Sequence, residues 1–388
     1  ALVTRMLYAV PNLETRHEVV RLNVGTPTFN RAPGEATGTF ALESALDELA
    51  IALEMDPIEL RLRNYADADP DDARPWSSNS LRECYAAAAE RFGWSRRDPR
   101  PGSMRDGAGR IGWGMASATY PTIRQPASAC VRALPGGEVV VQAATHELGT
   151  GTYTVMAQIA AAALGITPER VRVQLGDTDW PETPISAGSM TVASTGSAVH
   201  AAALELRERL LARGGDGIAG ILDALDSPLE ALADARPGSE QRRYAMHAFG
   251  AVFAEVRVDE SLGTVRATRI VGAYGVGRVL NLRTARSQLL GGIVYALGHA
   301  LHEHTAIDPR TGRYVNADLA EYLLPVNADV REIDVLFVDE HDPHVNPLGA
   351  KGIGEIGATG VAAAIANAVH HATGRRIRDL PITLDRLL

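Results

Sequence analysis

The segment EVVVQAATHELGTGTYTVMAQIAAAALGITPERVRVQLGD, residues 138–177, carries the pattern that decides the fold class. A valine-rich run is followed by a glycine loop, an alanine-rich run at helical spacing and a second β-branched run. This order predicts strand, loop, helix and strand. The same order recurs faintly over residues 333–376, with too little similarity to define a repeat.

Elsewhere, helices and strands are predicted to mix without regular alternation. Apolar spacing and capping residues predict helices over residues 38–54, after Asp56, over 81–94 and over 284–302. Residues 247–278 alternate apolar and polar side chains on either side of a Ser-Leu-Gly turn, which predicts a β-hairpin. The irregular order favours an α+β fold with a mixed sheet over a doubly wound sheet.

Residues 96–110, RRDPRPGSMRDGAGR, are dense in charge, proline and glycine, and are predicted to form a linker. The linker is expected to separate a first part, residues 1–95, from a second part, residues 111–388. Residues 211–240 are predicted to form a surface helix between flexible ends. The chain starts at Ala1 with residues typical of the middle of a strand and loop, so we expect a fragment or a processed subunit.

Composition excludes several classes of protein. The 388 residues are 46% hydrophobic, which is ample for two or three domains. A net charge of -9 argues against binding to nucleic acid or to an anionic membrane, and no apolar run is long enough to predict a transmembrane helix. Cys84 and Cys130 stand far apart, so a thiolate-ligated metal is not expected. Buried free thiols are favoured, with a disulfide left open.

The loop GAKGIGEIGATG, residues 349–360, places Glu355 among five glycines and contains the only lysine, Lys351. GIGEIG matches the pattern GxGxxG, but no strand is predicted directly before it and a carboxylate in the turn would repel a phosphate. A classical dinucleotide site is therefore disfavoured. Glycines let a backbone approach a bulky ligand, and a glutamate among apolar neighbours is a candidate general base. An ordinary glutamate on an exposed loop is the competing interpretation.

Three further segments have candidate binding residues. HELGTGTYT, residues 146–154, opens a predicted helix, and residues 185–202 concentrate small and hydroxyl side chains, which suit either close packing or a phosphate-bearing cofactor. Arg31 stands just ahead of the first helix. The sequence has no HExxH or GxSxG pattern, so a protein-ligated metal and a serine hydrolase lack support.

Four segments, in order along the chain, together resemble the molybdopterin-binding large subunit of the xanthine dehydrogenase and aldehyde oxidase family. They are residues 30–64, 147–181, 247–281 and 349–381. The ELGTGTYT form, with Thr150 where many relatives carry glutamine, is most similar to the bacterial branch in which the molybdenum, flavin and iron–sulfur parts are separate chains.

The resemblance implies mixed-sheet, two-layer molybdenum-cofactor-binding domains of the xanthine oxidase type. It implies molybdopterin with Mo, in the cytosine dinucleotide form, and partner subunits that carry FAD and a 2Fe-2S cluster. The implied substrate is an aldehyde or an N-heterocycle, oxidised with oxygen from water, and the electrons leave through the partners. The cytoplasm is the favoured compartment, with the periplasm as the alternative.

By the same resemblance, Glu355 matches the catalytic base and Arg31 matches an arginine beside the molybdenum. The implied cofactor-contacting residues are Gly149, Thr150, Gly151, Ala187, Gly188, Ser189, Lys351, Gly352, Ile353 and Gly354. No protein side chain is implied as a metal ligand. Two alternatives stay open: a nucleotide-binding dehydrogenase that uses the glycine loops, and a folded but inactive fragment that lacks the upstream half of the site.

Overall fold

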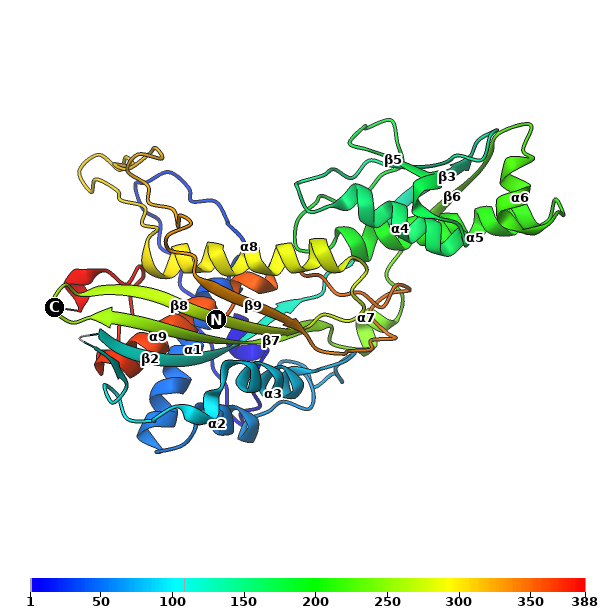
Figure 1. Ribbon diagram of the computed structural model, residues 1–388. Coiled ribbons are helices and arrows are strands. Elements are labelled where there is room, and N and C mark those ends of the chain that lie inside the picture. The colour runs from blue at the N-terminus through cyan, green and yellow to red at the C-terminus, as the bar shows by residue number, and fades with distance from the viewer. Residues whose placement is uncertain (1, 108, 388) are drawn as a thin grey trace.

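The computed structural model describes residues 2–107 and 109–387, in which the strands form two separate mixed sheets (Figure 1). One sheet has the order β1-β2-β7-β8-β9 and the other the order β5-β4-β3-β6. In both sheets one pair of neighbours is parallel, β8 with β9 and β4 with β5, and the other pairs are antiparallel. The strands are β1 (Arg105–Asp106), β2 (Gly109–Pro121), β3 (Ala127–Ala133), β4 (Val139–Ala143), β5 (Val171–Leu175), β6 (Leu229–Ala235), β7 (His247–Asp259), β8 (Thr264–Gly275) and β9 (Glu332–Phe337).

Helices cover both sheets. The α-helices are α1 (Glu35–Ala52), α2 (Pro57–Arg63), α3 (Leu81–Phe92), α4 (Thr152–Leu164), α5 (Ser197–Leu211), α6 (Gly217–Asp223), α7 (Glu240–Arg243), α8 (Leu282–Leu301) and α9 (Val361–Thr373). Short 3-10 or π turns are η1 (Leu2–Arg5), η2 (Trp94–Arg96), η3 (Pro168–Arg170), η4 (Val192–Gly196), η5 (Ile356–Ala358) and η6 (Leu384–Arg386). The predicted α+β class with mixed sheets is confirmed.

The five-stranded sheet is buried on both faces because β7 presents apolar residues to each side. Val252 and Val256 face the core beneath α8 and α9, whereas Phe249 and Phe253 face the core beneath α3. β7 and β8 form the predicted hairpin, and β7 also pairs with β2 from Gly109↔Asp259 to Pro121↔His247. A sheet buried in this way is a rigid support for the loops at its ends.

Helix α9 lies unusually close to β2. A Cβ atom added at Gly112 would lie 1.8 Å from the carbonyl oxygen of Ala368, and one added at Gly114 would lie 2.2 Å from the amide nitrogen of Ala368. Only glycine on the strand permits this approach, and the alanines of α9 permit it on the helix. The loop that precedes α9 is thereby held against the central sheet.

The four-stranded sheet forms a separate lobe with α4 and α5 packed on it (Figure 1). Residues 138–177 fold as predicted, into β4, a loop, α4 and β5. Because the lobe has its own apolar core, the N-terminus of α4 is presented toward the larger sheet by a second stable unit.

Several sequence predictions need correction. Residues 211–240 were expected to hold one surface helix, but they contain α6 and the strand β6, which pairs with β3. Strands β2 and β3 were not predicted. The segment 96–110, expected as a linker, contains β1 and the first residues of β2. The division at this segment into residues 1–95 and 111–388 stays a prediction.

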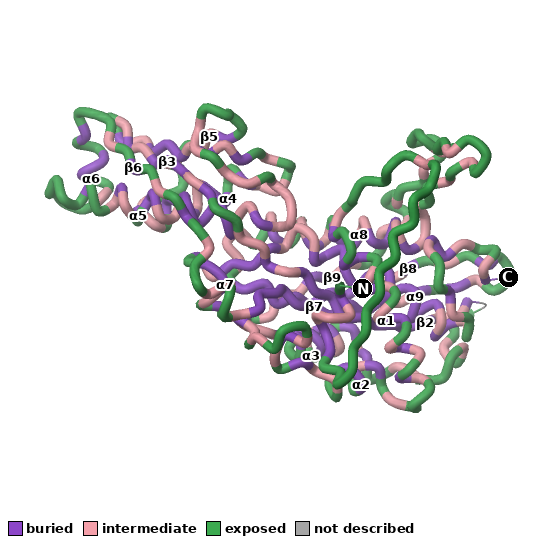
Figure 2. The backbone as a smooth tube through the Cα atoms, turned by 180° about the vertical axis from the view of Figure 1, so that it is seen from behind, coloured by how far each residue is buried: buried purple, intermediate pink, exposed green. Residues whose placement is uncertain are grey.

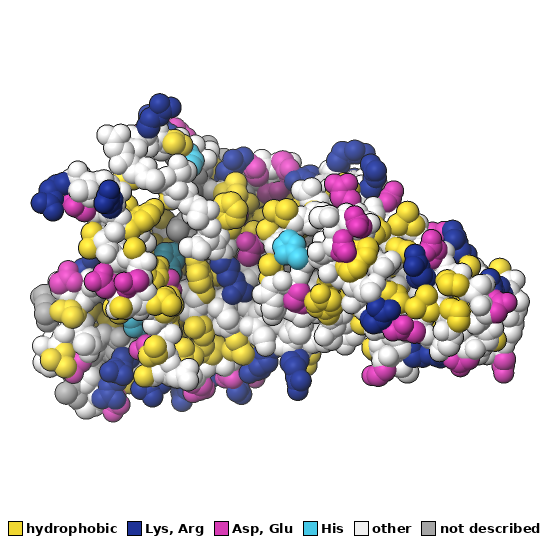
Figure 3. All heavy atoms as spheres, turned by 90° about the horizontal axis from the view of Figure 1, so that it is seen from above, with side chains coloured by type: hydrophobic (Ala, Val, Ile, Leu, Met, Phe, Trp, Pro, Cys, Tyr) yellow, Lys and Arg dark blue, Asp and Glu magenta, His cyan; other side chains and the backbone are white. Residues whose placement is uncertain are grey.

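The distribution of charged side chains on the surface agrees with the composition. Basic and acidic side chains are interspersed on the face shown in Figure 3. Cys84 and Cys130 are both buried free thiols, so the favoured interpretation is confirmed and the disulfide is excluded. Within residues 2–107 and 109–387, no helix is long and apolar enough to cross a membrane. Residues 9–23 form a long exposed segment near the N-terminus (Figure 2).

Candidate active site

The glycine loop of residues 349–360 connects β9 to α9 and is fastened at its start to the end of β8. Gly277 and Ala350 form an antiparallel bridge, and the amide of Lys351 donates to the carbonyl of Val276 at 3.0 Å. Residues 338–351 separate β9 from GIGEIG, so the motif does not follow a strand directly. The loop therefore starts from a fixed position that differs from the dinucleotide-binding turn.

The loop is pressed against Ser189. A Cβ at Gly352 would lie 2.4 Å from the carbonyl oxygen of Ser189, and one at Gly354 would lie 3.1 Å from its Oγ. The first two glycines of the motif are therefore explained by contacts within the chain. Because they lack a Cβ atom, the segment of residues 185–192 can pack against the loop.

Glu355 is partly buried, and hydrogen bonds hold both its carboxylate and the peptide that precedes it. Ser189 Oγ donates to Glu355 Oε2 at 3.1 Å. Arg31 donates from Nε to the carbonyl of Gly354 at 2.6 Å and from Nη2 to the carbonyl of Gln288 at 2.8 Å. The structure thus brings the two residues expected to be catalytic, Glu355 and Arg31, to the same place from opposite ends of the chain. Burial lowers the pKa of Arg31, and the Glu355 carboxylate opposes that shift.

Two titratable residues beside Glu355 were missed by sequence reasoning. Tyr120, at the end of β2, has its pKa raised well above the usual range by burial and by the Glu355 carboxylate. Burial is also the main cause that raises the pKa of Glu35, and the charge of Glu355 adds to it. Glu35 ends the segment NRAPGE, residues 30–35, so its place four residues after Arg31 was available as a signal. Tyr120 lies on an unpredicted strand and had none.

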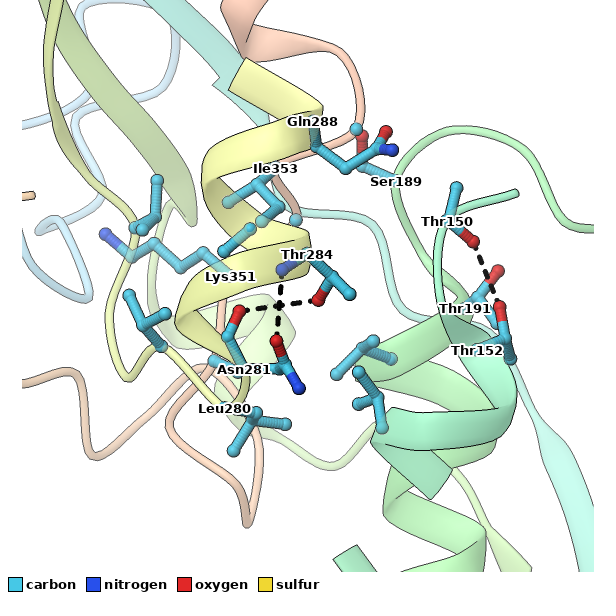
Figure 4. Close-up of a pocket in the computed structure, with 18 of the residues that line it drawn as sticks. Thr150, Thr152, Ser189, Thr191, Leu280, Asn281, Thr284, Gln288, Lys351 and Ile353 are labelled. Carbon is cyan, nitrogen blue, oxygen red and sulfur yellow. Dashed lines mark hydrogen bonds between the residues drawn. The ribbon is translucent and has the colours of Figure 1, made fainter. Parts of the chain in front are cut away.

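A pocket with about 780 Å³ of empty space, part of it open to solvent, adjoins Glu355. Four segments build it: the start of α4, the segment before η4, the start of α8 and the glycine loop (Figure 4). Of the predicted cofactor-contacting residues, those on its wall are Thr150, Ser189, Lys351, Gly352, Ile353 and Gly354. The other four, Gly149, Gly151, Ala187 and Gly188, lie within two residues of a wall residue along the chain.

The start of α4 already holds an anion. The carboxylate Oε1 of Glu147 accepts the amides of Thr150 at 2.6 Å and Gly151 at 3.1 Å. These hydrogen bonds lower the pKa of Glu147 against the opposing effect of its burial. An anionic ligand thus meets hydroxyl groups on this side of the pocket, such as those of Thr150 and Thr152, which lie 3.0 Å apart.

Lys351 contributes its backbone and methylene chain to the pocket, while its ammonium group points away from it (Figure 4). Its Nζ lies 3.0 Å from Glu340 Oε1 and 3.6 Å from Asp342 Oδ2, and all three side chains are almost completely buried. Asp342 also accepts the hydroxyl of Ser77 at 2.6 Å. The ammonium therefore anchors the loop and is not free for a ligand.

The glycine loop presents donors that its own fold does not use. Among the residues that the structure describes, the amides of Gly352, Ile353, Gly354 and Glu355 have no hydrogen-bond partner. Consecutive free amides beside glycines and hydroxyls fit a large polar cofactor with anionic groups. Residues 2–107 and 109–387 contain no group of three or more His, Cys, Asp or Glu that could hold a metal ion. The free amides and small residues of this loop thus fit the class of cofactor-binding proteins.

Comparison with known families agrees with this class. Two family models of the molybdopterin cofactor-binding domain match the chain, one over residues 87–331 and one over residues 1–65. The chain belongs to the molybdopterin cofactor-binding domain family, as the sequence resemblance implied.

The aldehyde oxidoreductase molybdenum-binding subunit PaoC of Escherichia coli (strain K12) is 40% identical over 405 residues, which cover 99% of this chain and 55% of that subunit. The putative xanthine dehydrogenase molybdenum-binding subunit XdhA of the same organism is 31% identical, over 92% of this chain and 52% of its own length.

Among solved structures, quinoline 2-oxidoreductase from Pseudomonas putida 86 superposes with a TM-score of 0.82 at 24% identity, covering 92% of this chain and 52% of that one. Aldehyde oxidoreductase from Desulfovibrio gigas superposes with a TM-score of 0.78 at 25% identity, covering 92% and 41%. These similarities confirm the fold. The chain spans about half the length of the curated relatives it matches.

Proposed function

We propose that this chain is the molybdenum-cofactor-binding part of an oxidoreductase that oxidises an aldehyde, with Glu355 as the general base. The observation that carries the proposal is the placement of Glu355 at the edge of the pocket, between Ser189 and the Arg31-bound peptide of Gly354. The relative with 40% identity is named as part of an aldehyde oxidoreductase, which favours an aldehyde over an N-heterocycle.

The groups that would hold the cofactor are the free amides of Gly352–Glu355 and the hydroxyl of Thr191 on the pocket wall. We propose the cytosine dinucleotide form of molybdopterin. We also propose that FAD and 2Fe-2S groups reside on partner subunits, because the relative PaoC is named as the molybdenum-binding subunit of its enzyme.

Oxidation of an aldehyde to a carboxylic acid takes one oxygen from water and releases two electrons and two protons. The molybdenum cofactor, when bound, supplies the two-electron redox chemistry. The Glu355 carboxylate accepts the proton of the water-derived oxygen as that oxygen attacks the aldehyde carbon. Arg31 holds the peptide before Glu355 in place, and the Ser189 hydroxyl orients the carboxylate. The chain's own residues thus supply proton transfer and orientation.

The test is Glu355→Gln, which removes the base and keeps the shape of the side chain. The matched control is Glu90→Gln, an exposed glutamate on α3. We expect loss of at least about 100-fold in aldehyde turnover for Glu355→Gln, with molybdenum content unchanged, and no change for Glu90→Gln. Retained turnover in Glu355→Gln would refute the role of this residue as the base.

Metal analysis and substrate range test the rest of the proposal. Stoichiometric molybdenum and faster turnover of aldehydes than of purines support it. Binding of NAD without molybdenum would instead support a nucleotide-binding dehydrogenase. If turnover appears only after the chain is combined with the remaining half of a relative's length, the chain alone is an inactive part of the enzyme.

A further inference from the structure

Ser189 adopts a backbone conformation that side chains rarely adopt. Its φ is 55°, in the left-handed region, where Cβ crowds the backbone. Only four described non-glycine residues have a positive φ, and two of them, Ala32 and Ser189, adjoin Arg31 and Glu355. A serine kept in such a conformation beside a candidate base suggests a function for its side chain, because glycine would avoid the strain.

The glycine loop packs closely against Ser189 and restricts its position. Its carbonyl and Oγ face Gly352 and Gly354, where an added Cβ would lie at 2.4 Å and 3.1 Å from these two atoms. Lys351, next to Gly352, is anchored by its buried ion pair with Glu340. The loop is therefore stiff on one side of Ser189, and the left-handed turn aims the hydroxyl along the loop toward residue 355.

We propose that Ser189 is a positioning residue for the base: its hydroxyl donates to Glu355 Oε2 and fixes the direction of the carboxylate. This inference rests on the proposed role of Glu355. Ser189 Oγ donates to Glu355 Oε2 at 3.1 Å, and Tyr120 is the other described side chain that hydrogen-bonds this carboxylate. Sequence resemblance placed Ser189 among the cofactor contacts, whereas its hydroxyl is directed to the protein's own glutamate.

Other titratable groups also lie beside Glu355. Arg31 and Glu35 come from the segment before and at the start of α1, and Tyr120 comes from the end of β2. A test of Ser189 must therefore leave these three residues unchanged. A hydroxyl that orients the base acts on the chemical step, so its removal is expected to lower kcat and to leave KM little changed.

The experiment compares Ser189→Ala with Ser189→Gly in the full chain loaded with its cofactor. Both changes remove the hydroxyl, but only glycine relieves the backbone strain. We expect kcat to fall by about 10- to 100-fold in both variants, with KM little changed. We expect Ser189→Gly to melt about 1 to 3 °C above Ser189→Ala, so that activity and stability separate.

Two controls separate the effect of backbone strain from the effect of the interaction between Ser189 and Glu355. Ala73→Gly relieves an equally positive φ of 60° on the exposed surface and is expected to leave kcat unchanged. In a Glu355→Gln background, adding Ser189→Ala is expected to cost nothing further, because the residue that it positions is already gone.

The outcomes separate the two proposals. Parental kcat in both Ser189 variants, or a further loss in the Glu355→Gln background, would overturn the inference about Ser189. Loss of molybdenum in the Ser189 variants would overturn it as well, in favour of direct cofactor binding by the hydroxyl. Full activity of Glu355→Gln itself would remove the proposed function on which the inference depends.

Discussion

Replacing Gly352 with alanine tests whether the loop is shaped by contact with Ser189. Gly352 does not have a positive φ, so alanine is compatible with its backbone and the only obstacle is space. The new Cβ would lie 2.4 Å from the Ser189 carbonyl oxygen and 2.5 Å from Ser189 Cβ. Neither atom belongs to the end of a flexible side chain, so a backbone must move.

The size of the effect follows from that overlap. Ordinary contact begins at 3.4 Å, so Ser189 and the loop must separate by about 1 Å. Overpacking of this kind costs about 1 to 3 kcal/mol, which lowers the melting temperature of a chain of this size by about 1 to 4 °C. The same displacement breaks the geometry between Ser189 Oγ and Glu355, so we expect a loss of about 100-fold in turnover.

Thermal unfolding and steady-state turnover measure the two effects, with molybdenum content as the loading standard. The control is Gly25→Ala, where an added Cβ meets nothing within 4 Å and φ is not positive. If Gly352→Ala melts and turns over like Gly25→Ala, the close approach of Ser189 to the loop is wrong, and so is the steric explanation of the glycine motif.

Two further predictions concern stability. Lys351→Met leaves Glu340 and Asp342 buried without their cation and is expected to lower the free energy of unfolding by about 3 to 5 kcal/mol in denaturant titrations. Adding Asp342→Asn is expected to recover part of that loss. An unchanged denaturation midpoint in the single variant would contradict the role of Lys351 as an anchor of the loop. Burial lowers the pKa of both His247 and His371 to about 4 from an ordinary value of 6.5, so between these values the unfolded chain binds more protons. The free energy of unfolding should therefore decrease as pH falls from 6.5 toward 4, by roughly 1.4 kcal/mol per pH unit for each histidine, and denaturant titrations that show no such slope would refute the assignment of neutral buried rings.

The helices were predictable because their signals are local. Asp56 accepts the amide of Ile58 at 2.7 Å and Pro57 opens α2, as the capping pattern indicated. The hairpin of β7 and β8 was likewise predicted from alternation around a short turn. Each of these features depends on residues close together in the chain, which is what periodicity and capping measure.

The missed strands lack a clear local signal. β6 alternates in burial, but its alanines and leucines suit a helix equally well. β2 is buried on both faces along most of its length, so it shows no alternation, and its small residues reflect the approach of α9. β6 has exposed and acidic residues and is a strand because it pairs with β3 from Ala127↔Ala235 to Ala133↔Leu229. Burial and pairing of this kind depend on distant partners, which no window of sequence contains.

For the candidate site, the sequence by itself determined the glycine loop, the glutamate within it, the arginine ahead of the first helix and, through the resemblance, the cofactor family. Only the tertiary structure decided that Ser189 reaches Glu355, that Tyr120 and Glu35 adjoin it, and that the single lysine turns inward to Glu340 and Asp342. The physical reason is that a sequence motif shows only which chemical groups a segment offers. The direction of each side chain is set by packing and charge between residues far apart in the chain, such as Arg31 and Gly354.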